Sequence, residues 1–329
     1  MPASAAVRIL LDHYRANART LPWRSPPGQA PMDPYKVWLS EVMLQQTTVS
    51  TVTPRFTRFV ERWPTVEALA AAADEEILGE WAGLGYYARA RNLIACARTV
   101  VARESFPTSE TELRTLPGVG DYTAAAIAAI AFGRDSTPID TNVERVVARL
   151  KGLTDKAAVR AAAIALTPAG QAGDFAQALM DLGATLCRPK NPDCPACPLR
   201  ADCTGYLRGR PEAYPAPKMK KDRPHRHGIA FWYQQDDALF LVRRPDKGML
   251  GGMAALPGDD WAGDSPPPVE ALTTVSHGFT HFTLDLHVVR ASGSPNDEGW
   301  WHDLDRIGQA GLPTLFAKAV AQVRAKERS

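Results

Sequence analysis

One glutamate in this chain has neighbours that suit acid–base chemistry. Glu41 lies within a predicted helix over residues 33–47, with Val37 one turn before it and Leu44 one turn after it. A carboxyl group among apolar neighbours loses solvation, which raises its pKa and favours the protonated acid. The alternative is a half-exposed glutamate on a surface helix, because buried glutamates are rare unless they are paired or functional.

A second carboxylate, Asp140, comes directly before another predicted helix. Thr141 and Glu144 have the spacing of a capping box, so we expect Thr141 to cap this helix. A carboxylate held at a helix start remains ionised and is oriented by backbone amides. Asp140 is therefore a candidate for a fixed negative charge, although a helix start without further function explains the same residues.

Four of the five cysteines lie close together on a proline-rich stretch with the spacing Cys-x6-Cys-x2-Cys-x5-Cys. They are Cys187, Cys194, Cys197 and Cys203. Thiolates so close on a turn-rich loop can bind zinc or an iron–sulfur cluster, and the residue types alone do not separate the two. A disulfide pair is the third possibility, but the pattern is not that of a secreted disulfide framework. The remaining cysteine, Cys96, is expected to be a small buried residue.

A glycine-rich turn at residues 116–124 reads Leu-Pro-Gly-Val-Gly-Asp-Tyr-Thr-Ala and leads into an alanine-rich run. Gly118 and Gly120 would allow a tight turn between two helices and a close approach of the backbone to a ligand. Backbone amides at a helix start suit a phosphate. An ordinary helix–helix turn is the alternative, since glycine is common at helix ends.

Apolar residues at helical spacing predict the elements that carry these groups. Helices are expected at residues 5–18, 33–47, 65–78, 88–102, 155–167 and 174–186. A loop at residues 79–85 joins two of them and ends in a Gly-x-Gly-Tyr-Tyr segment. The N-terminal part of the chain is therefore predicted to be mainly α-helical.

The pattern changes to strands after a linker at residues 205–227, which is rich in proline and basic residues. The linker would be either a solvated spacer or a strap that follows phosphates. Residues 229–233 and 238–242, separated by a polar turn, predict a β-hairpin. A further strand at residues 284–289 and a closing helix at residues 314–323 complete a predicted α+β C-terminal part.

The bulk composition limits the class of protein. With 329 residues the chain is long enough for two or three domains, and a formal charge of +2 does not by itself indicate a nucleic-acid binder. Any DNA contact would have to come from local basic patches and backbone amides. The sequence contains no run of eighteen apolar residues and no signal-peptide layout, so a cytoplasmic protein is expected.

Several of these motifs, in their order along the chain, resemble those of the MutY-type adenine DNA glycosylases. Residues 40–47, Ser-Glu-Val-Met-Leu-Gln-Gln-Thr, resemble the catalytic-glutamate motif, and residues 116–140 resemble the helix-hairpin-helix with its following aspartate. The cysteine spacing resembles that of relatives with a [4Fe-4S] cluster. The resemblance implies a helix-hairpin-helix glycosylase domain, with a six-helix lobe and a cluster lobe, at residues 1–204, the linker at 205–227 and a Nudix-like domain at 228–329.

The C-terminal part resembles the lesion-recognition domain of the same family. Residues 248–253 and 256–258 resemble its Nudix-like motif, but no glutamate-rich helix follows that could bind the magnesium of a Nudix hydrolase. This domain is therefore interpreted as a reader and not as a pyrophosphatase. Residues 276–282, Ser-His-Gly-Phe-Thr-His-Phe, match the loop that recognises 8-oxoguanine, with Thr280 where most members have serine.

The resemblance implies removal of adenine opposite 8-oxoguanine or guanine in duplex DNA, without strand cleavage and by a monomer acting on the nucleoid. Glu41 would protonate adenine N7 and Asp140 would stabilise the oxocarbenium-like sugar. The resemblance implies roles for further residues. Tyr122 and Asn142 would hold the geometry of the catalytic groups, Arg24, Leu44 and Gln177 would contact the adenine or the DNA, and Gln46 and Tyr86 would fill the space that the extruded base leaves in the stack. Gly118 and Gly120 would bind a phosphate, and Phe279, Thr280 and His281 would recognise the lesion. Thr141 stands where the family usually has glycine.

Three other functions remain to be weighed. An endonuclease-III-like enzyme for oxidised pyrimidines needs a lysine nucleophile two residues after the second hairpin glycine, where this chain has Tyr122. A non-catalytic iron–sulfur DNA-binding protein would not need both Glu41 and Asp140. A nucleotide pyrophosphatase would need the missing glutamate-rich helix.

Overall fold

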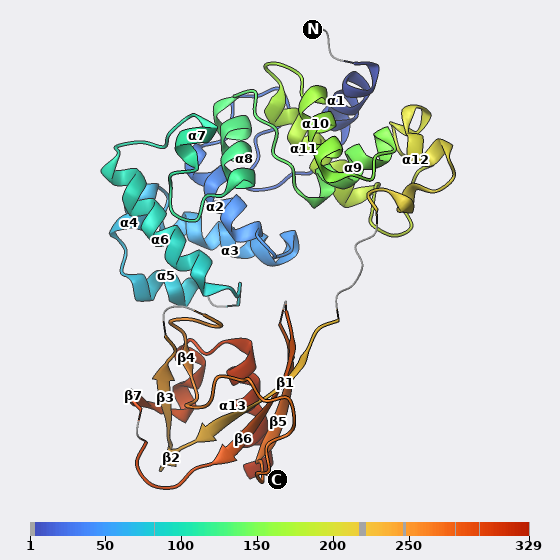
Figure 1. Cartoon of the computed structure of the whole chain (residues 1–329). Helices are drawn as coiled ribbons and strands as arrows, with labels where there is room; N and C mark the ends of the chain where they lie inside the picture. Colours follow the sequence, from blue (N-terminus) through green and yellow to red (C-terminus); the bar gives the residue numbers. More distant parts are fainter. Residues whose placement is uncertain are drawn as a thin grey trace. The chain divides into compact units, whose positions relative to one another are not determined.

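The computed structural model describes residues 4–81, 83–216, 222–245, 248–279, 281–295 and 297–328. The chain divides into two compact units, one formed by Met1–Asp74 with Arg91–Met219 and the other by Glu75–Ala90 with Lys220–Ser329. The first unit is helical, and the second contains all of the described strands (Figure 1). The predicted mainly α N-terminal part and α+β C-terminal part are therefore confirmed.

The helices predicted at residues 5–18, 88–102, 155–167 and 174–186 are confirmed to within two residues at each end. In chain order the N-terminal helices are α1 (Ala5–Asn17), α2 (Pro34–Leu44), α3 (Val49–Arg62), α4 (Val66–Ala71), α5 (Asp74–Glu80), α6 (Tyr87–Ala102), α7 (Glu110–Leu113), α8 (Asp121–Phe132), α9 (Thr141–Lys151), α10 (Lys156–Leu166), α11 (Ala172–Thr185) and α12 (Thr204–Leu207). Two short 3-10 helices, η1 (Arg200–Asp202) and η2 (Pro211–Ala213), flank α12.

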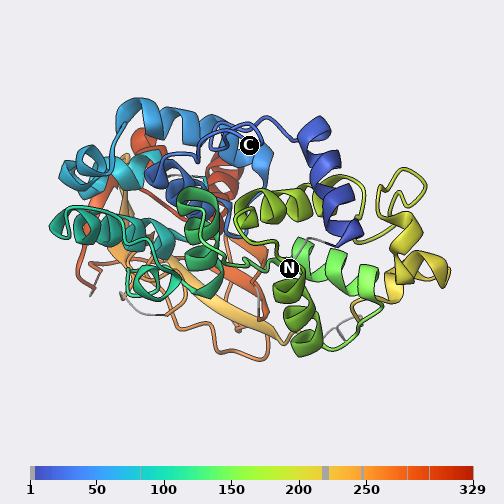
Figure 2. The same cartoon turned by 90° about the horizontal axis from the view of Figure 1, so that it is seen from above.

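Helices α1, α9, α10 and α11 share one hydrophobic core, and Figure 2 shows them grouped on one side of the helical unit. Leu10, Val147, Val159 and Phe175 are almost completely buried in it. Helix α8 is apolar nearly all round, so it packs both on α2 and on α11. This packing fixes the first turn of α8 between the two helices that carry Glu41 and Gln177.

The single helix predicted at residues 65–78 is wrong. The chain forms α4 and α5 instead, because Ala72 takes an extended conformation with ψ 153° and a new helix begins at Asp74. Thr65 caps α4 by accepting the amide hydrogen of Ala68. An alanine-rich run contains no residue that marks a break, so local propensity alone favours one continuous helix.

The second unit contains two small sheets and a closing helix. Strands β1 (His225–Trp232), β6 (Thr283–Arg290) and β5 (Thr273–Gly278) form one sheet in that order, with β1 parallel and β5 antiparallel to β6. The other sheet joins β2 (Gln234–Gln235), β3 (Ala238–Arg243), β4 (Ala254–Ala255) and β7 (Gly299–Asp303). The short helix η3 (Leu304–Gln309) precedes α13 (Thr314–Glu327), which packs on β5.

One face of the β1-β6-β5 sheet is apolar and the other is polar. Leu284, Leu286 and Val288 of β6 are buried in the core with Trp232 and Phe316. Their neighbours on β6 point to the opposite face, because successive side chains alternate along a strand. The polar face carries several histidines, whose arrangement is described below.

The β-hairpin predicted between residues 229–233 and 238–242 is wrong in its pairing. The first strand belongs to the β1-β6-β5 sheet, and only Gln234–Gln235 forms a hairpin with β3. The chain changes sheets at Tyr233, directly after the buried Trp232, whose indole N–H donates to the Gln234 side chain at 2.9 Å. A polar turn between two apolar runs predicts the turn itself, whereas strand pairing depends on residues far along the chain.

The predicted linker at residues 205–227 is partly folded. It contains the end of α12 and η2, and Tyr214 is buried, with its carbonyl accepting a hydrogen bond from Arg149. Residues 217–221 lie outside the described part of the chain. Strand β1 then begins at His225, still inside the predicted linker.

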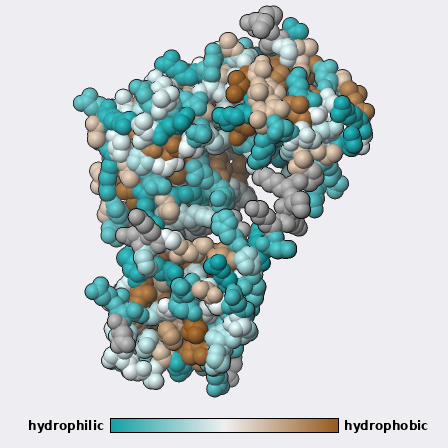
Figure 3. Space-filling model, in the orientation of Figure 1, coloured by the Kyte–Doolittle hydropathy of each residue, from teal (hydrophilic) through white to brown (hydrophobic). Residues whose placement is uncertain are grey.

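The exposed surface is mixed in character. Figure 3 shows hydrophilic residues interrupted by separate hydrophobic patches, in keeping with exposed apolar side chains such as Ile164 and Leu207. Among the described residues, no helix has both the length and the apolar character needed to cross a membrane.

Candidate active site

A pocket of about 710 Å³ opens in the helical unit. Helices α2, α8, α9 and α11 line it, together with the segment before α2. The structure brings the following predicted site residues to its wall: Arg24, Glu41, Leu44, Gln46, Tyr122, Asp140, Asn142 and Gln177. Residues from four regions of the sequence therefore converge on one space large enough for a nucleobase.

Glu41 is the acid in this wall. Its side chain lies on α2, which begins at Pro34 after the capping residue Asp33. Glu41 is 8% exposed, and this burial raises its pKa to about 7. A hydrogen bond with Tyr122 and the charge of Arg24 offset part of the rise, whereas the charge of Asp140 adds to it. The predicted desolvation of Glu41 is confirmed, so the carboxyl group is partly protonated near neutral pH.

Helix α2 ends earlier than predicted, at Leu44 and not at Thr47. Gln46 has a positive φ of 55°, a conformation that cannot continue an α-helix. The turn leaves Leu44 half-buried and Gln46 exposed, both on the pocket wall.

Asp140 is the second carboxylate of the pocket and caps α9 itself. Its Oδ1 accepts the amide hydrogen of Val143 at 2.7 Å, and its Oδ2 accepts a hydrogen of the Asn142 amide at 2.8 Å. The predicted capping role of Thr141 is therefore wrong: the cap lies one residue earlier. Both carboxylate oxygens are held, and they lie at the positive end of a helix dipole, which stabilises negative charge.

Thr141 is the first residue of α9 and lies on the pocket wall. It is not among the described residues with positive φ, so its backbone takes a conformation open to any residue. The glycine usual in the resembled family is thus not required here by the backbone.

Tyr122 connects the hairpin to the pocket. The hairpin joins α7 to α8, and Gly118 has a φ of 72°. A Cβ atom at Gly118 would also lie 2.7 Å from the Cβ of Asn92, so both the backbone and the space favour glycine. Gly120 occupies the N-cap of α8 without a side-chain cap, which leaves amides of the first turn open to a ligand. Tyr122, in that turn, is half-buried beside Glu41.

Asp181, which the sequence did not single out, pairs with two arginines of the pocket wall, Arg19 and Arg24. Its Oδ1 accepts hydrogen bonds from Arg24 at 2.8 Å and from Arg19 at 2.6 Å, and the Arg24 and Asp181 side chains are almost buried. Gln177 lies one turn before Asp181 on α11 and is 6% exposed. The i,i+4 spacing of Gln177 and Asp181 was the signal that could have placed both on the same helix face.

The Oε1 atom of Gln177 has no hydrogen-bond partner within the described part of the chain. Its Nε2 donates to the Gly173 carbonyl at 3.4 Å. A buried acceptor without a partner is costly unless a ligand or water supplies a donor. Gln177 therefore lines the pocket with a side chain whose buried acceptor is unsatisfied.

Arg145 links the pocket to the cysteine-rich loop. It donates to Asn142 Oδ1 at 2.8 Å, to the Gly183 carbonyl at 2.7 Å and to the Cys187 carbonyl at 2.8 Å. The same Asn142 donates to Asp140, so a continuous hydrogen-bonded chain runs from the carboxylate to the first cysteine. Sequence analysis missed Arg145, although a charged residue among the valines of α9 was a visible signal.

The four predicted cysteine ligands line one small cavity next to η1 and α12. Arg149 holds this loop, donating to the Cys187 sulfur at 3.4 Å and to the Arg188 and Pro189 carbonyls at 2.7 and 2.9 Å. Burial raises the pKa of the Cys197 thiol to about 11. Four thiols around one cavity with an arginine beside them fit a metal-containing group whose ligated form carries negative charge.

Comparison with known proteins gives two family matches. The family described as HhH-GPD superfamily base excision DNA repair protein matches residues 39–168, and the NUDIX domain matches residues 228–322. An adenine DNA glycosylase of Buchnera aphidicola subsp. Baizongia pistaciae is 30% identical over 346 residues, which cover 96% of this chain and 95% of that protein.

The chain belongs to the adenine DNA glycosylase family. An Arabidopsis thaliana member is 36% identical over 75% of this chain, which spans about half of that longer protein (46%). A solved structure of endonuclease III in a non-covalent complex with DNA has a TM-score of 0.51 and 25% identity, and covers 64% of this chain and 99% of that one. The helical part of this chain therefore shares its fold with that endonuclease III structure.

The remaining residues that the family resemblance singles out lie in the other unit. Tyr86 is 54% exposed and has a positive φ of 48°. Phe279 stacks on Trp261 with ring centroids 5.7 Å apart, and Trp261 was missed by sequence analysis. His281 is exposed, and Thr280 lies outside the described residues. The structure thus places these residues in a different unit from the pocket.

Cys96 is completely buried, as predicted.

The burial of Glu41 predicts a stability that depends on pH. Its pKa of about 7 in the folded protein is above the ordinary value of 4.5, so the folded state holds this proton more tightly and loses stability as pH rises from 4.5 to 7. Glu41→Gln should therefore be more stable than the wild type above pH 7, by about 3 kcal/mol, with no advantage below pH 4.5. Urea unfolding at several pH values measures the difference, with the exposed Glu61→Gln as a control that should show no such trend. If the free energies of unfolding of Glu41→Gln and the wild type differed by the same amount at every pH, the raised pKa of Glu41 would be contradicted.

Proposed function

We propose that the chain excises adenine paired with 8-oxoguanine or guanine in duplex DNA and does not itself cleave the strand. The observation that carries this proposal is one pocket shared by the buried acid Glu41, with a pKa of about 7, and the hydrogen-bonded carboxylate Asp140. Two carboxyl groups in contrasting environments are what acid-assisted cleavage of a glycosidic bond requires.

The two groups divide the reaction between them. The adenine nucleotide must first rotate out of the duplex, at a cost of a few kcal/mol. Protonated Glu41 donates its proton to adenine N7, so the base leaves without negative charge. The Asp140 carboxylate stabilises the positive charge that develops on the sugar. A water molecule then adds to the sugar carbon and gives its proton to the Glu41 carboxylate formed in the first step. Asn142 and Arg145 keep the Asp140 carboxylate in place.

Gln177 supports a preference for adenine. Its unpartnered Oε1 can accept a hydrogen from the exocyclic amino group of adenine, whereas guanine presents a carbonyl oxygen at that position. The ion pair between Arg24 and Asp181 fixes the neighbouring wall. Specificity then arises because the wrong base would leave the buried acceptor unsatisfied.

Replacing Gln177 with leucine should lower the single-turnover rate of adenine excision by about 10- to 100-fold, equivalent to one lost hydrogen bond of 1.4 to 2.8 kcal/mol. Affinity for a duplex that already contains the abasic product should change little, because no base then occupies the pocket. Excision at the wild-type rate would show that Gln177 does not contact the base.

Absence of strand cleavage rests on the residue at the hairpin. A glycosylase that also cleaves the strand uses an amine nucleophile to form a Schiff base. Tyr122 stands at the position of that amine, and none of the described residues that line the pocket is a lysine. The endonuclease-III-like alternative lacks its nucleophile in this pocket.

The open amides at the start of α8 support a role in binding a DNA phosphate. Gly120 leaves the first turn of α8 without a side-chain cap, and amides at the positive end of a helix attract a phosphate. Gly118 allows the close approach of the backbone.

The loop at Phe279 and His281 is proposed to read the 8-oxoguanine, as the family resemblance implies. The Phe279 ring contacts Trp261, with ring centroids 5.7 Å apart, and Phe282, with ring centroids 4.8 Å apart. A ring fixed in this way can stack on or wedge beside a base.

Cys187, Cys194, Cys197 and Cys203 would hold a [4Fe-4S] cluster. The cluster would supply stabilisation of the loop between α11 and α12 and no step of the excision. Arg149 would complement the negative charge of the ligated cluster.

The proposal is tested with three duplexes under single-turnover conditions: adenine opposite 8-oxoguanine, adenine opposite guanine, and thymine glycol opposite adenine. We expect breaks in the adenine strands only after alkali treatment, because an abasic site is alkali-labile and no lysine is among the described residues that line the pocket. Breaks without alkali, or release of thymine glycol in preference to adenine, would support the endonuclease-III-like alternative.

A further inference from the structure

A group of imidazole and carboxylate side chains lies on the polar face of the β1-β6-β5 sheet, and neither the pocket nor the lesion-reading loop accounts for it. His225 and His227 are on β1, and Asp285 and His287 are on β6. The parallel register sets His227 beside Asp285 and Ile229 beside His287. Because alternate residues share a face, all four side chains project from the same side of the sheet.

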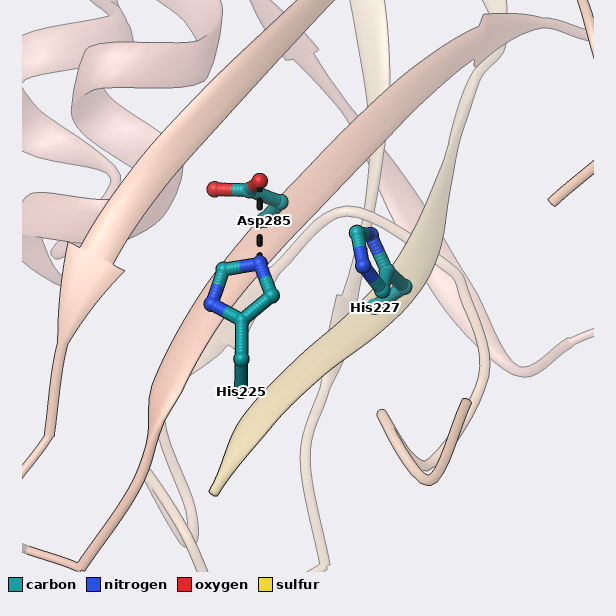
Figure 4. Close-up of side chains that lie close together, drawn as sticks. All are labelled: His225, His227 and Asp285. Atoms are coloured by element: carbon teal, nitrogen blue, oxygen red, sulfur yellow. Dashed lines mark hydrogen bonds and ion pairs between the residues drawn. The ribbon is translucent and has the colours of Figure 1, made fainter. Parts of the chain in front are cut away.

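The nitrogen and oxygen atoms of this group converge. His225 Nε2 lies 3.1 Å from Asp285 Oδ2, and His227 Nδ1 lies 3.1 Å from His287 Nε2. His225, His227 and Asp285 each offer an atom within 4.8 Å of the other two, as Figure 4 shows. Neighbouring ligands on tetrahedral zinc are ~3.3 Å apart, as follows from Zn–N and Zn–O bonds of about 2.0–2.2 Å.

Hydroxyl groups contact a second nitrogen or oxygen atom on His225, His287 and Asp285. Thr283 Oγ1 contacts His225 Nδ1 at 2.8 Å, and Thr274 Oγ1 contacts His287 Nδ1 at 3.2 Å. Ser276 donates to Asp285 Oδ1 at 2.6 Å. These contacts leave His225 Nε2 and Asp285 Oδ2 facing each other and His287 Nε2 facing His227. Metal-binding histidines and carboxylates are oriented by such outer partners.

We propose that His225, His227 and Asp285 bind a divalent first-row metal ion, with zinc the best match, and that His287 is the hydrogen-bond partner of His227. Two imidazole nitrogens and one carboxylate oxygen, with water as the fourth ligand, form a donor set that zinc accepts and that magnesium and calcium, which prefer oxygen, do not. The ion joins the first residues of β1 to β6. It therefore stabilises the parallel pair at the point where the chain enters the sheet.

The test uses the full chain with its cysteine-bound cluster loaded, purified without a polyhistidine tag and treated with zinc chloride. We expect one zinc ion per chain, with only nitrogen and oxygen in the first shell by X-ray absorption. When the free zinc concentration is about a hundred times the dissociation constant, the Tm should rise by about 5 °C or more.

Variants separate this site from the cysteines. His225→Gln and Asp285→Asn should each weaken zinc binding at least a hundredfold, and Ser276→Ala about tenfold, because it removes only an orienting partner. His302→Gln, on β7, is the matched control and should bind as the wild type does. Circular dichroism and iron content identify variants that fold. Sulfur in the zinc shell, no stoichiometric binding at micromolar zinc, or equal affinity in His225→Gln, Ser276→Ala and the wild type would overturn the proposal.

Discussion

Replacing Glu41 with glutamine is expected to lower the single-turnover rate of adenine excision by about a thousandfold. Glutamine has nearly the same shape and can still form a hydrogen bond with Tyr122, but it has no proton to donate to the leaving base. General acid catalysis typically contributes 10²- to 10⁴-fold. Product formation from an adenine:8-oxoguanine duplex, resolved after alkali treatment, measures the rate.

Binding distinguishes a chemical defect from a structural one. The Glu41→Gln variant should bind the same mispaired duplex with at least wild-type affinity, because it removes a buried acid whose ionisation is unfavourable. An excision rate within tenfold of the wild type would mean that another group protonates the base, and the assignment of Glu41 would be wrong.

Replacing Asp140 with asparagine is expected to have a comparably large effect, also about a thousandfold. The Oδ1 of asparagine can still cap α9 at Val143, so the backbone of the site should survive. The charge proposed to stabilise the oxocarbenium-like sugar is lost, and an electrostatic contribution of this kind is typically worth several kcal/mol. Asparagine also places two amide groups, its own and that of Asn142, side by side.

Asp155→Asn is a matched control for this substitution. Asp155 caps α10 through the Ala158 amide at 2.8 Å, in the same way that Asp140 caps α9, but it does not line the pocket. Both variants should lose a similar, small amount of stability in urea unfolding, whereas only Asp140→Asn should lose excision. If both variants retained activity, Asp140 would be a helix cap and nothing more.

The sequence predicted the environment of Glu41 because that environment is local. The apolar neighbours are on the same helix, one turn before and one turn after, so helical spacing alone indicates desolvation. The cap of α9 was placed one residue too late because Asp140, Thr141 and Asn142 are all good capping residues. Only the bond from Asp140 to Val143 distinguishes them, and it is a feature of the folded backbone.

Contacts between distant segments could not be predicted. Arg24 meets Asp181 across 157 residues of sequence, and Arg145 reaches Cys187 across 42. The same limit explains the misassigned hairpin, since β1 pairs with a strand that begins more than fifty residues later. The spacing of residues along one helix predicts which of them share a face. It does not predict which distant segment packs on that face.

Protonated Glu41, with a pKa of about 7, is the proposed acid of adenine excision. The most direct test is the single-turnover rate of the wild type on an adenine:8-oxoguanine duplex between pH 5.5 and 9. Because the acid form is the active one, the rate should fall above pH 7 and approach a tenfold loss per pH unit, while Glu41→Gln stays low throughout. A wild-type rate that is constant up to pH 9, or that rises with pH, would contradict the account.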